Sequence, residues 1–569
     1  MSAATAEPAA GRVLIPGTAR AEVLACHDGL SFWGGVDPAT GRIIDIHHPC
    51  HGRSVAGRIL LMPTSRGSCS GSGVLVELAL AGLAPAALVF CEAEEILTLG
   101  ALVADRVFGH PIPLLSLPRA AFDRLAGAAH ARLAPDRLSA EGFGIPLEAA
   151  AIEAVALSAR DRARLSGAEG PAVRLAMEVI CRMAAAAGAG GLIDVRRGHI
   201  DGCILAHSAN LRFAEEMARR GARVVIPTTI NAISVDRENW RRQGVAADFG
   251  SRASRLADAY VAMGARPVFT CAPYLLDDPP GRGEAIGWSE SNAVIYANSV
   301  LGARTAKHPD YLDLFIAMTG RAPATGIHSE AGRAAAAVIE LADLPEGADD
   351  LLWPLLGWLA GRLAPDRIPL LTGLEALRPS GDDLKSLCAA FGTTSGAPML
   401  HVAGHTPEAA RPPAPGARRH RVGRADLAAA WRALNGGGTA IDLVAIGSPH
   451  ASLDELRRIE ALLAGHRPAD GTEVIVTLGR DSLRKATAEG LAARLADAGV
   501  RLLPDLCWCS MTEPVFPART RTLMTNSGKY AHYAPALTGR QARLASLADC
   551  IRAAVRGTAP AGPPAWLGG

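Results

Sequence analysis

Aromatic side chains are scarce in this chain of 569 residues, where Phe, Trp and Tyr together make up only 4%. Proteins that bind single-stranded nucleic acid stack the bases on such side chains, and proteins that bind phosphate backbones need an excess of Lys and Arg. Here 58 Lys and Arg stand against 56 Asp and Glu, which gives a formal net charge of +2. We therefore expect neither a nucleic-acid partner nor an anionic membrane partner.

Long apolar runs and a targeting leader are also lacking. The most apolar segment, residues 74–90, contains Glu77 and Pro85 and is too short to cross a bilayer. The first residues, MSAATAEPAAGRVLIPG, show no basic stretch followed by an apolar one, so they do not resemble a secretory signal. These features predict a soluble, cytoplasmic protein whose thiols stay reduced.

Several common catalytic motifs are missing. Gly528 and Lys529 are followed by Tyr530 and lack the upstream glycine of a phosphate-binding loop. No strand-like run is followed by GxGxxG with a distal acid, and neither a serine elbow nor an HExxH helix occurs. Nucleotide binding and the hydrolase chemistries of those motifs are therefore not expected.

What the sequence does contain is an alternation of strand-like and helical runs. The chain exceeds the roughly 250 to 300 residues of one hydrophobic core, so at least two domains are expected. Residues 11–120 hold short strand-like runs and one helix that begins near Ser72, which predicts a βαβ unit in a small domain. Residues 121–156 lack a strand signal and are interpreted as a connector. Residues 157–560 alternate in the manner of a large α/β domain with mainly parallel strands.

Eleven cysteines are too few for a disulfide scaffold in so long a chain and too many to ignore. Cys271 follows the strand-like run 265–270, and Cys507 and Cys509 follow the run 500–506. Because α/β proteins bind ligands at the carboxyl ends of their strands, these three thiols are candidates for one metal site. Any one of them alone is more often a small buried hydrophobe, so the hypothesis depends on the grouping.

The kind of metal site is open from the spacing alone. No CxxC pair recurs, which disfavours a structural zinc site. Ligands dispersed over a long chain are compatible with an iron–sulfur cluster but do not identify one. The remaining cysteines are interpreted as mainly structural, with Cys550 as the alternative ligand if one of the three is wrong.

Polar residues gather in four further segments. The turn at 66–68, between a predicted strand and helix, brings backbone N–H groups and a positive helix end together, which favours an anion and lowers the cost of a serine alkoxide. A Ser/Gly helix start without chemistry is the alternative. The other segments are HIDGC (199–203), WSESNAVIYANSVLGARTAK (288–307) and TNSGKY (525–530), each of which can equally be a cap, a turn or a solvated loop.

Taken together, these segments resemble the aconitase X family, a branch of the aconitase superfamily. The resemblance covers nearly the whole chain apart from the first ten residues, the connector and the tail. It implies a small, swivelling N-terminal β/α domain that closes over a large, multilayered α/β catalytic domain. The matching segments are RGSCSGSGVLVELALAGLAPAALVFCEAEEILTLGALVA, HIDGC, VVIPTTINAISVD, TCAPYL, WSESNAVIYANSVLGARTAKHPDY, HVAGHTPEA, GSPHASLDE and TNSGKYAHY.

The resemblance also implies an activity. Bacterial members with both parts in one chain resemble enzymes that dehydrate cis-3-hydroxy-L-proline to Δ1-pyrroline-2-carboxylate, and archaeal members split into two subunits act on mevalonate 5-phosphate. The fused chain therefore favours a hydro-lyase for the hydroxy amino acid, with no obligate partner subunit. Dehydration of another hydroxy acid, such as mevalonate 5-phosphate, and a non-catalytic iron–sulfur sensor are the alternatives.

The same resemblance implies an iron–sulfur cofactor. Archaeal members carry cysteine in a GCPH motif, whereas this chain has Ser448 in the corresponding GSPH. That difference removes one expected thiolate and argues against a three-iron or four-iron cluster. A 2Fe-2S cluster is implied instead, held by Cys271 and by one or both of Cys507 and Cys509.

By resemblance to aconitase chemistry, a serine of the small domain removes the substrate's C2 proton. Ser68 is the expected base, with Ser70 and Ser72 as alternatives. The remaining residues implied to bind substrate are Arg66, Asn298 and Lys529, as carboxylate or hydroxyl contacts, and His199 and Asp201, at the wall of the site.

Overall fold

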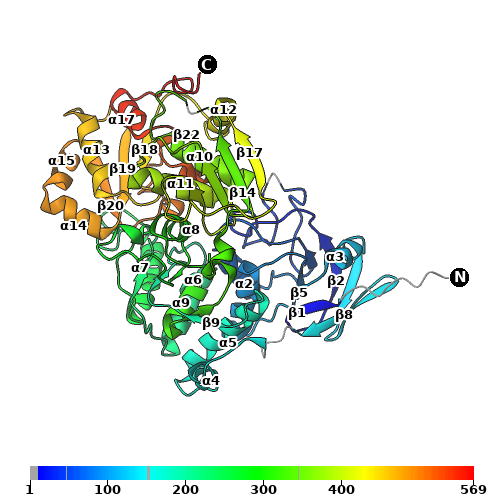
Figure 1. Ribbon diagram of the computed structural model, residues 1–569. Helices are drawn as coiled ribbons and strands as arrows, with labels where there is room; N and C mark the ends of the chain where they lie inside the picture. The colour runs from blue at the N-terminus through cyan, green and yellow to red at the C-terminus, as the bar shows by residue number, and fades with distance from the viewer. Residues whose placement is uncertain (1–9, 46–47, 150–153, 344, 569) are drawn as a thin grey trace. The chain divides into compact units, whose positions relative to one another are not determined.

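The computed structural model describes residues 10–45, 48–149, 154–343 and 345–568. The chain divides into two compact units (Figure 1). Unit 1 comprises Met1–Val195, His207–Ile226 and His308–Thr325, and unit 2 comprises Arg196–Ala206, Pro227–Lys307 and Gly326–Gly569.

Unit 1 contains a closed β-barrel with the strand order β1-β5-β4-β3-β2-β6-β7-β8. Strands β2, β3, β4 and β5 pair in parallel, and the helices α1 and α2 make the crossovers from β3 to β4 and from β4 to β5, which confirms the predicted βαβ unit. The elements are β1 (Gly11–Ile15), β2 (Ala19–Ala25), β3 (Ile59–Leu61), α1 (Gly71–Leu80), β4 (Ala87–Phe90), α2 (Ile96–Phe108), β5 (Leu114–Ser116) and α3 (Arg119–Ala126).

The barrel is completed by three antiparallel strands that the sequence did not predict. They are β6 (His130–Leu133), β7 (Arg137–Ala140) and β8 (Phe143–Ala149), and they occupy much of the expected connector. Strands β6 and β7 have only four residues each, and β8 contains Gly144 and Pro146, so none of them shows the longer run on which a strand prediction depends. The interpretation of residues 121–149 as a connector is therefore wrong, and residues 150–153 lie outside the described residues.

The rest of unit 1 is helical. Arg321 joins separate parts of the chain, because its guanidinium pairs with Asp161 at 2.9 Å beside the short antiparallel ribbon of β9 and β13. Helices α6 and α9 meet through Phe213 and Tyr311, whose ring centroids lie 4.2 Å apart. The elements are α4 (Ala159–Leu165), α5 (Pro171–Ala186), β9 (Leu192–Asp194), α6 (Ser208–Arg219), α9 (Leu312–Thr319) and β13 (Arg321–Pro323).

Unit 2 contains three parallel sheets, and this confirms the predicted α/β class. Their strand orders are β11-β10-β12, β16-β15-β14-β17 and β20-β19-β18-β21-β22, and all paired neighbours run parallel. The strands are β10 (Gly198–Ile200), β11 (Thr228–Ile230), β12 (Gly287–Trp288), β14 (Ala337–Leu341), β15 (Pro369–Thr372), β16 (His401–Val402), β17 (Arg418–Val422), β18 (Leu443–Ile446), β19 (Glu473–Leu478), β20 (Val500–Pro504), β21 (Thr522–Thr525) and β22 (Gln541–Leu544).

Strand β18 is the point at which the order of the largest sheet reverses. From β18 the chain continues through β19 and β20 on one side and then returns to place β21 and β22 on the other side. The loops that leave β18 and β21 therefore diverge at the carboxyl edge of the sheet, which is where open α/β sheets bind their ligands.

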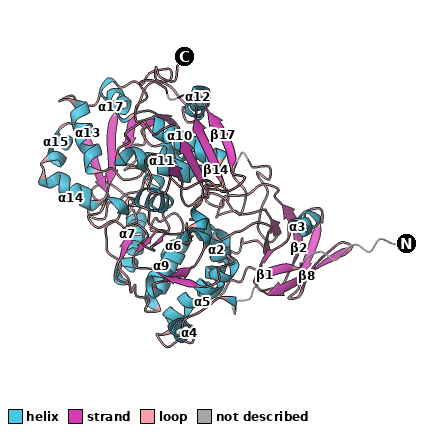
Figure 2. Ribbon diagram, in the orientation of Figure 1, coloured by secondary structure: helices cyan, strands magenta, loops and turns pink. Residues whose placement is uncertain are grey.

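Helices cover these sheets closely. In Figure 2, α10 and α11 lie beside β14 and β17. Two glycines of α10 allow the close approach of α11, because a Cβ at Gly357 would lie 2.3 Å from the carbonyl oxygen of Leu387 and one at Gly361 would lie 2.1 Å from Oγ1 of Thr394. The helices are α7 (Ala247–Ala262), α8 (Ser291–Tyr296), α10 (Leu352–Leu363), α11 (Gly381–Thr394), α12 (Arg424–Ala433), α13 (Leu453–Leu463), α14 (Arg480–Ala488), α15 (Leu491–Asp497), α16 (Gly528–Thr538) and α17 (Leu547–Arg556).

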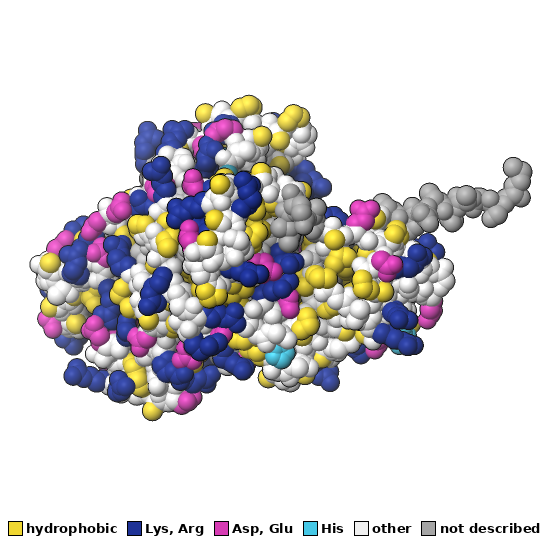
Figure 3. Space-filling model, turned by 90° about the horizontal axis from the view of Figure 1, so that it is seen from below, with side chains coloured by type: hydrophobic (Ala, Val, Ile, Leu, Met, Phe, Trp, Pro, Cys, Tyr) yellow, Lys and Arg dark blue, Asp and Glu magenta, His cyan; other side chains and the backbone are white. Residues whose placement is uncertain are grey.

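Within the described residues, every helix is too short or too polar to cross a bilayer. On the face seen in Figure 3, Lys and Arg side chains are interspersed with Asp, Glu and apolar ones, in keeping with the net charge of +2.

Candidate active site

Unit 2 brings together the three cysteines that the sequence proposed as metal ligands. Cys507 follows β20, and Cys509 lies in the short 3-10 helix Trp508–Ser510. The thiols of Cys507 and Cys509 are hydrogen-bonded to each other. Both also interact electrostatically with the thiol of Cys271. That hydrogen bond raises the pKa of Cys507 and lowers the pKa of Cys509, and burial raises the pKa of Cys271 to about 12.

The segment before Cys271 differs from its prediction. Residues 265–270 form no strand beyond one isolated bridge. Pro267 has no N–H to donate to a ladder, and Phe269 has a φ of 42°, which is incompatible with an extended strand. Cys271 therefore follows an irregular segment, whereas Cys507 does follow the carboxyl end of a parallel strand.

His450, in the loop after β18, links the two cysteine segments. Its backbone N–H donates to Sγ of Cys271 at 3.3 Å, and its Nε2 lies 2.8 Å from the carbonyl oxygen of Leu506. Leu506 directly precedes Cys507 in the chain. An N–H donated to a ligand sulfur stabilises the thiolate and tunes a metal bound to it. The sequence had singled out this histidine only as the last residue of GSPH.

Lys529, near the start of α16, supplies the positive charge beside the thiols. Its Nζ lies 2.9 Å from Oε1 of Glu290. Burial acts to lower the pKa of Lys529, but Glu290 and the three cysteines outweigh it and raise that pKa well above its ordinary value. For Glu290, burial acts upward, yet Lys529 and neighbouring amides lower the pKa to about 2. The two side chains therefore form a charged pair in the interior.

The side-chain amide of Asn231 is hydrogen-bonded to two carboxylates, those of Asp201 and Glu290. Nδ2 of Asn231 donates to Oδ1 of Asp201 at 2.6 Å and to Oε2 of Glu290 at 3.1 Å. Burial, followed by the negative charge of Glu290, raises the pKa of Asp201 to about 7. Near neutral pH, Asp201 can therefore gain or lose a proton while Glu290 stays ionised, which is the usual way that paired carboxylates acquire different roles.

Asn292 connects this pair to the cysteine segment. Its Nδ2 donates to Oε1 of Glu290 at 2.6 Å and to the carbonyl oxygen of Cys271 at 3.0 Å, and its Oδ1 accepts from the hydroxyl of Tyr274 at 2.8 Å. The amides Asn231 and Asn292, together with Glu290, were not identified from the sequence. Glu290 and Asn292 lie in the polar segment 288–307, and Asn231 lies in a segment that was noted only for the family resemblance. An amide that positions a carboxylate has no spacing that distinguishes it from a cap.

Two residues that the sequence placed at the site have structural surroundings. The Asn298 side chain is fully buried and donates to the carbonyl oxygens of Thr305 and Pro398 at 2.8 and 2.9 Å, while its Oδ1 accepts from the N–H of Thr305. His199 in β10 is also buried, and burial lowers its pKa to about 4, so it is neutral. Its Nδ1 lies 2.7 Å from Oγ1 of Thr229. We therefore leave Asn298 out of the proposed site and regard His199 as a positioning residue that is hydrogen-bonded to Asn231, the amide that donates to Asp201.

The alternative ligand Cys550 lies elsewhere in unit 2. It is fully buried in α17, within the hydrophobic core around β18 and β19. Burial raises the pKa of its thiol well above the ordinary value. This placement is that of a small buried hydrophobe.

The serines proposed as the base lie in unit 1, where their surroundings differ. Ser68 is half-buried in the turn before α1, and its Oγ accepts the N–H of Ser70 at 3.3 Å. Ser72 is fully buried, and its Oγ donates to the carbonyl oxygens of Cys69 and Asp310 at 3.0 and 3.3 Å. Ser72 therefore has a structural role, whereas Ser68 has an accessible hydroxyl with a backbone donor. Arg66, two residues earlier, is exposed.

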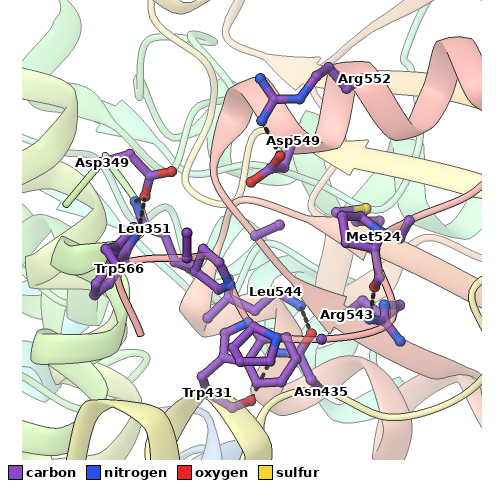
Figure 4. A pocket seen from close by; sticks show the side chains of 17 residues that line it. Asp349, Leu351, Trp431, Asn435, Met524, Arg543, Leu544, Asp549, Arg552 and Trp566 are labelled. Carbon is purple, nitrogen blue, oxygen red and sulfur yellow. Dashed lines mark hydrogen bonds and ion pairs between the residues drawn. The ribbon is translucent and has the colours of Figure 1, made fainter. Parts of the chain in front are cut away.

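A separate pocket of unit 2 contains none of these residues. It has a volume of about 360 Å³ and lies next to the tail residues 559–566 (Figure 4). Its polar groups bond to one another: Trp566 Nε1 donates to Asp349 at 3.2 Å, and Arg543 donates to the carbonyl oxygen of Pro560 at 2.7 Å. This pocket therefore does not have the exposed reactive groups of a catalytic site.

Four domains of the aconitase X family match this chain. They are the swivel domain over residues 8–140, the first domain over 154–331, the second domain over 335–432 and the third domain over 441–556. The swivel match ends at Ala140, the last residue of β7, which agrees with the inclusion of β6 and β7 in the barrel.

Relatives match along most of the chain. Cis-3-hydroxy-L-proline dehydratase of Pseudomonas aeruginosa is 50% identical over 98% of this chain and 98% of its own length. The enzyme of the same name from Hypocrea jecorina is 46% identical over 96% of this chain and 95% of its own length. The phosphomevalonate dehydratase large subunit of Methanothermobacter thermautotrophicus is 33% identical over 66% of this chain and 93% of its own length.

Similarity also extends to a separate subunit and to a solved structure. The phosphomevalonate dehydratase small subunit of Methanothermobacter thermautotrophicus is 45% identical over 107 residues, which are 19% of this chain and 77% of that subunit. The crystal structure of Thermococcus kodakaraensis aconitase X in its holo-form matches with a TM-score of 0.64 at 28% identity, over 70% of this chain and 100% of that one. The chain belongs to the aconitase X family.

Proposed function

We propose that this protein is a hydro-lyase that removes water from cis-3-hydroxy-L-proline and forms Δ1-pyrroline-2-carboxylate. The observation that carries this proposal is the identity of 46% to 50%, over nearly the whole chain, with enzymes named for that substrate. The relative named for phosphomevalonate is only 33% identical and matches two thirds of the chain. The swivel domain and the catalytic domains are also present in one chain, so no partner subunit is needed to supply either.

The family suggests a metal or iron–sulfur cofactor, and we infer a 2Fe-2S cluster held by Cys271, Cys507 and Cys509. The donor set fits such a group, because Cys271 is buried and accepts an N–H, Cys507 and Cys509 are half-buried and interact electrostatically with it, and the ammonium of Lys529 offsets the negative charge of the thiolates. Ser448 stands where a fourth thiolate would be expected. When bound, the cluster supplies a Lewis acid that polarises the C3 hydroxyl of the substrate.

The substrate carboxylate needs cationic partners as negative charge develops at C2. Lys529 has three N–H donors and uses one for Glu290, so further donors can reach a carboxylate. Arg66, exposed at the turn before α1, is proposed as a second contact from the swivel domain. Fixed cations of this kind stabilise the charge that builds up in the transition state.

Proton transfer is assigned to Ser68 and Asp201. Ser68, as an alkoxide, takes the proton from C2, and the backbone N–H of Ser70 stabilises the anionic oxygen before the step. The C2–H electron pair forms the C2=C3 double bond while the C3–O bond breaks. Asp201 donates its proton to the departing hydroxide, so that water leaves. The enamine that remains tautomerises to the cyclic imine without further help from the protein.

The first test is of the substrate itself. Protein purified without oxygen is incubated with cis-3-hydroxy-L-proline, with its trans isomer and with mevalonate 5-phosphate, and loss of water is followed by mass spectrometry. We expect turnover of the cis isomer alone. Turnover of mevalonate 5-phosphate in its place would assign the second activity, and inertness toward all three would contradict the proposal.

Replacing the proposed base tests the role of the swivel domain. Ser68→Ala should lower kcat by about 10² to 10⁴ while substrate binding persists, because the proton acceptor is lost and the carboxylate contacts remain. Ser70→Ala is the matched control: it removes the hydroxyl to which Oγ of Ser68 donates at 3.4 Å but retains the backbone N–H that donates to Ser68, so kcat should fall much less. If Ser70→Ala loses turnover and Ser68→Ala keeps it, Ser70 is the base instead.

The proposed proton donor predicts a pH dependence. Asp201 must be protonated to act, and its pKa of about 7 means that kcat should fall as the pH rises through that region. Asp201→Asn should lower kcat and remove this alkaline fall, because an amide does not titrate. Asp349→Asn, at the separate pocket, is the control and should keep the fall. An unchanged alkaline limb in Asp201→Asn would show that another group titrates.

His450 is expected to hold the cysteine segments in position. In His450→Ala the bond to Leu506 is lost in the interior, which costs about 1 to 3 kcal/mol, and the loop that donates to Cys271 loosens. Iron and sulfide per chain should therefore fall. His405→Ala is the matched control, because Nε2 of His405 also lies 2.9 Å from a backbone carbonyl, that of Leu374, away from the cysteines. Equal iron content in the two variants would refute the positioning role.

A further inference from the structure

We propose that unit 1 carries a second metal site, of the zinc type, formed by Cys26, His48 and Cys50. The three side chains are 0%, 6% and 7% exposed. One ligand atom from each lies within 4.8 Å of the other two. Tetrahedral zinc with bonds of about 2.0 to 2.3 Å separates its ligand atoms by about 3.5 to 3.8 Å, so small side-chain movements bring this set to the metal geometry.

The backbone holds the three residues from two directions. Cys26 directly follows β2, and its N–H donates to the carbonyl oxygen of Leu61 at the end of β3 at 2.8 Å, so it is fixed to the barrel. His48 and Cys50 lie in a turn, in which the N–H of His51 donates to the carbonyl oxygen of His48 at 2.9 Å. Nδ1 of His48 accepts the N–H of Cys50 at 3.1 Å, and Nε2 lies 3.4 Å from the carbonyl oxygen of Asp28, so the ring is held beside the thiol. A metal bound at Nδ1 would replace the bond to the N–H of Cys50, while Nε2–H continues to donate to Asp28.

The donor set selects the class of metal. Two thiolates and one imidazole are soft and borderline ligands, which favour Zn²⁺ over Mg²⁺ or Ca²⁺. Three protein ligands leave one tetrahedral position for water or another donor. These residues belong to unit 1, whereas the three cysteines assigned to the cluster belong to unit 2, so the two metal sites use separate ligands.

The loop that contains this site has little secondary structure to hold it in place. Between β2 and β3 the chain runs from residue 26 to residue 58, and its described part contains isolated β-bridges but neither a helix nor a strand. Connections of this length without secondary structure are uncommon in compact domains. A metal that joins Cys26 to His48 and Cys50 closes most of the loop and removes conformational freedom from it.

The same loop shapes the turn that contains Ser68. The N–H of Arg66 donates to the carbonyl oxygen of Leu30 at 3.3 Å, and Leu30 bridges to Ser65. A Cβ at Gly67 would lie 2.4 Å from Oγ of Ser31, so the loop and the turn are in close contact. The metal would therefore also hold the serine turn in place, and this part of the inference rests on the proposed function.

Metal analysis tests the site independently of activity. Cluster-loaded protein purified without oxygen and without chelators should contain about one zinc per chain in addition to its iron. Cys50→Ser and Cys26→Ser should lose the zinc and keep iron and sulfide. Cys181→Ser, which removes another buried thiol of unit 1, should keep both metals. Zinc that persists in Cys50→Ser, or an oxidised Cys26–Cys50 pair in protein prepared with a reductant, would overturn the proposal.

A second measurement covers variants that fail to fold. Wild-type protein with an intact cluster is treated with a zinc chelator and titrated with Co²⁺, which should produce a thiolate-to-cobalt charge-transfer absorption that saturates at one equivalent. His48→Ala should weaken this binding. Absence of both zinc and the cobalt absorption in the wild type would refute the site, and because neither signal depends on turnover, such a failure leaves the dehydratase proposal untouched.

Discussion

The Lys529–Glu290 ion pair is the interaction on which the arrangement around the cysteines depends. A buried ion pair is costly to desolvate, and it persists only when its remaining donors and acceptors are satisfied. Here Asn231 and Asn292 bond the carboxylate, and the three thiols lie in the field of the ammonium. The pair thereby links α16, α8 and the segment of Cys271. A change in either charge would shift the pKa of the Asp201 carboxyl and of the three thiols.

The sheet topology explains why these groups meet. His450 follows β18, Cys507 follows β20, and Lys529 follows β21, so the carboxyl edge of one parallel sheet supplies all three. Parallel strands carry every such loop to the same edge, and the reversal of order at β18 separates neighbouring loops there. Asp201 follows β10 of another sheet in the same way. The reactive groups are thus placed by rigid strands, which suits a site whose donors must stay within a few tenths of an ångström.

The sequence predicted the parts of this arrangement that alternate regularly or carry unusual residue types. The α/β class, the parallel strands and the βαβ unit followed from the alternation of strand-like and helical runs, and the grouping of Cys271 with Cys507 and Cys509 followed from their places after apolar runs. The strands β6 to β8 were missed because β6 and β7 have only four residues each and β8 contains Gly144 and Pro146, which are uncommon inside strands. Asn231, Glu290 and His450 were missed because their importance lies in hydrogen bonds between distant segments, which leave no pattern in one sequence. Asn298 was predicted to bind substrate because it lies in a polar motif, but its side-chain amide is hydrogen-bonded to the backbone of Thr305 and Pro398.

The way the chain is divided between the two units determines where it can be split into separate polypeptides. Unit 1 is assembled from three stretches of chain, and its helices α6 and α9 return to it after the chain has entered unit 2. A cut at the border of the units would therefore sever the chain in several places, and neither piece would be continuous. The barrel, in contrast, is complete by Ala149 and is made from one uninterrupted stretch. A gene can therefore be split or fused after the codons of β8 without interrupting the barrel, because the chain leaves the barrel only once, after Ala149.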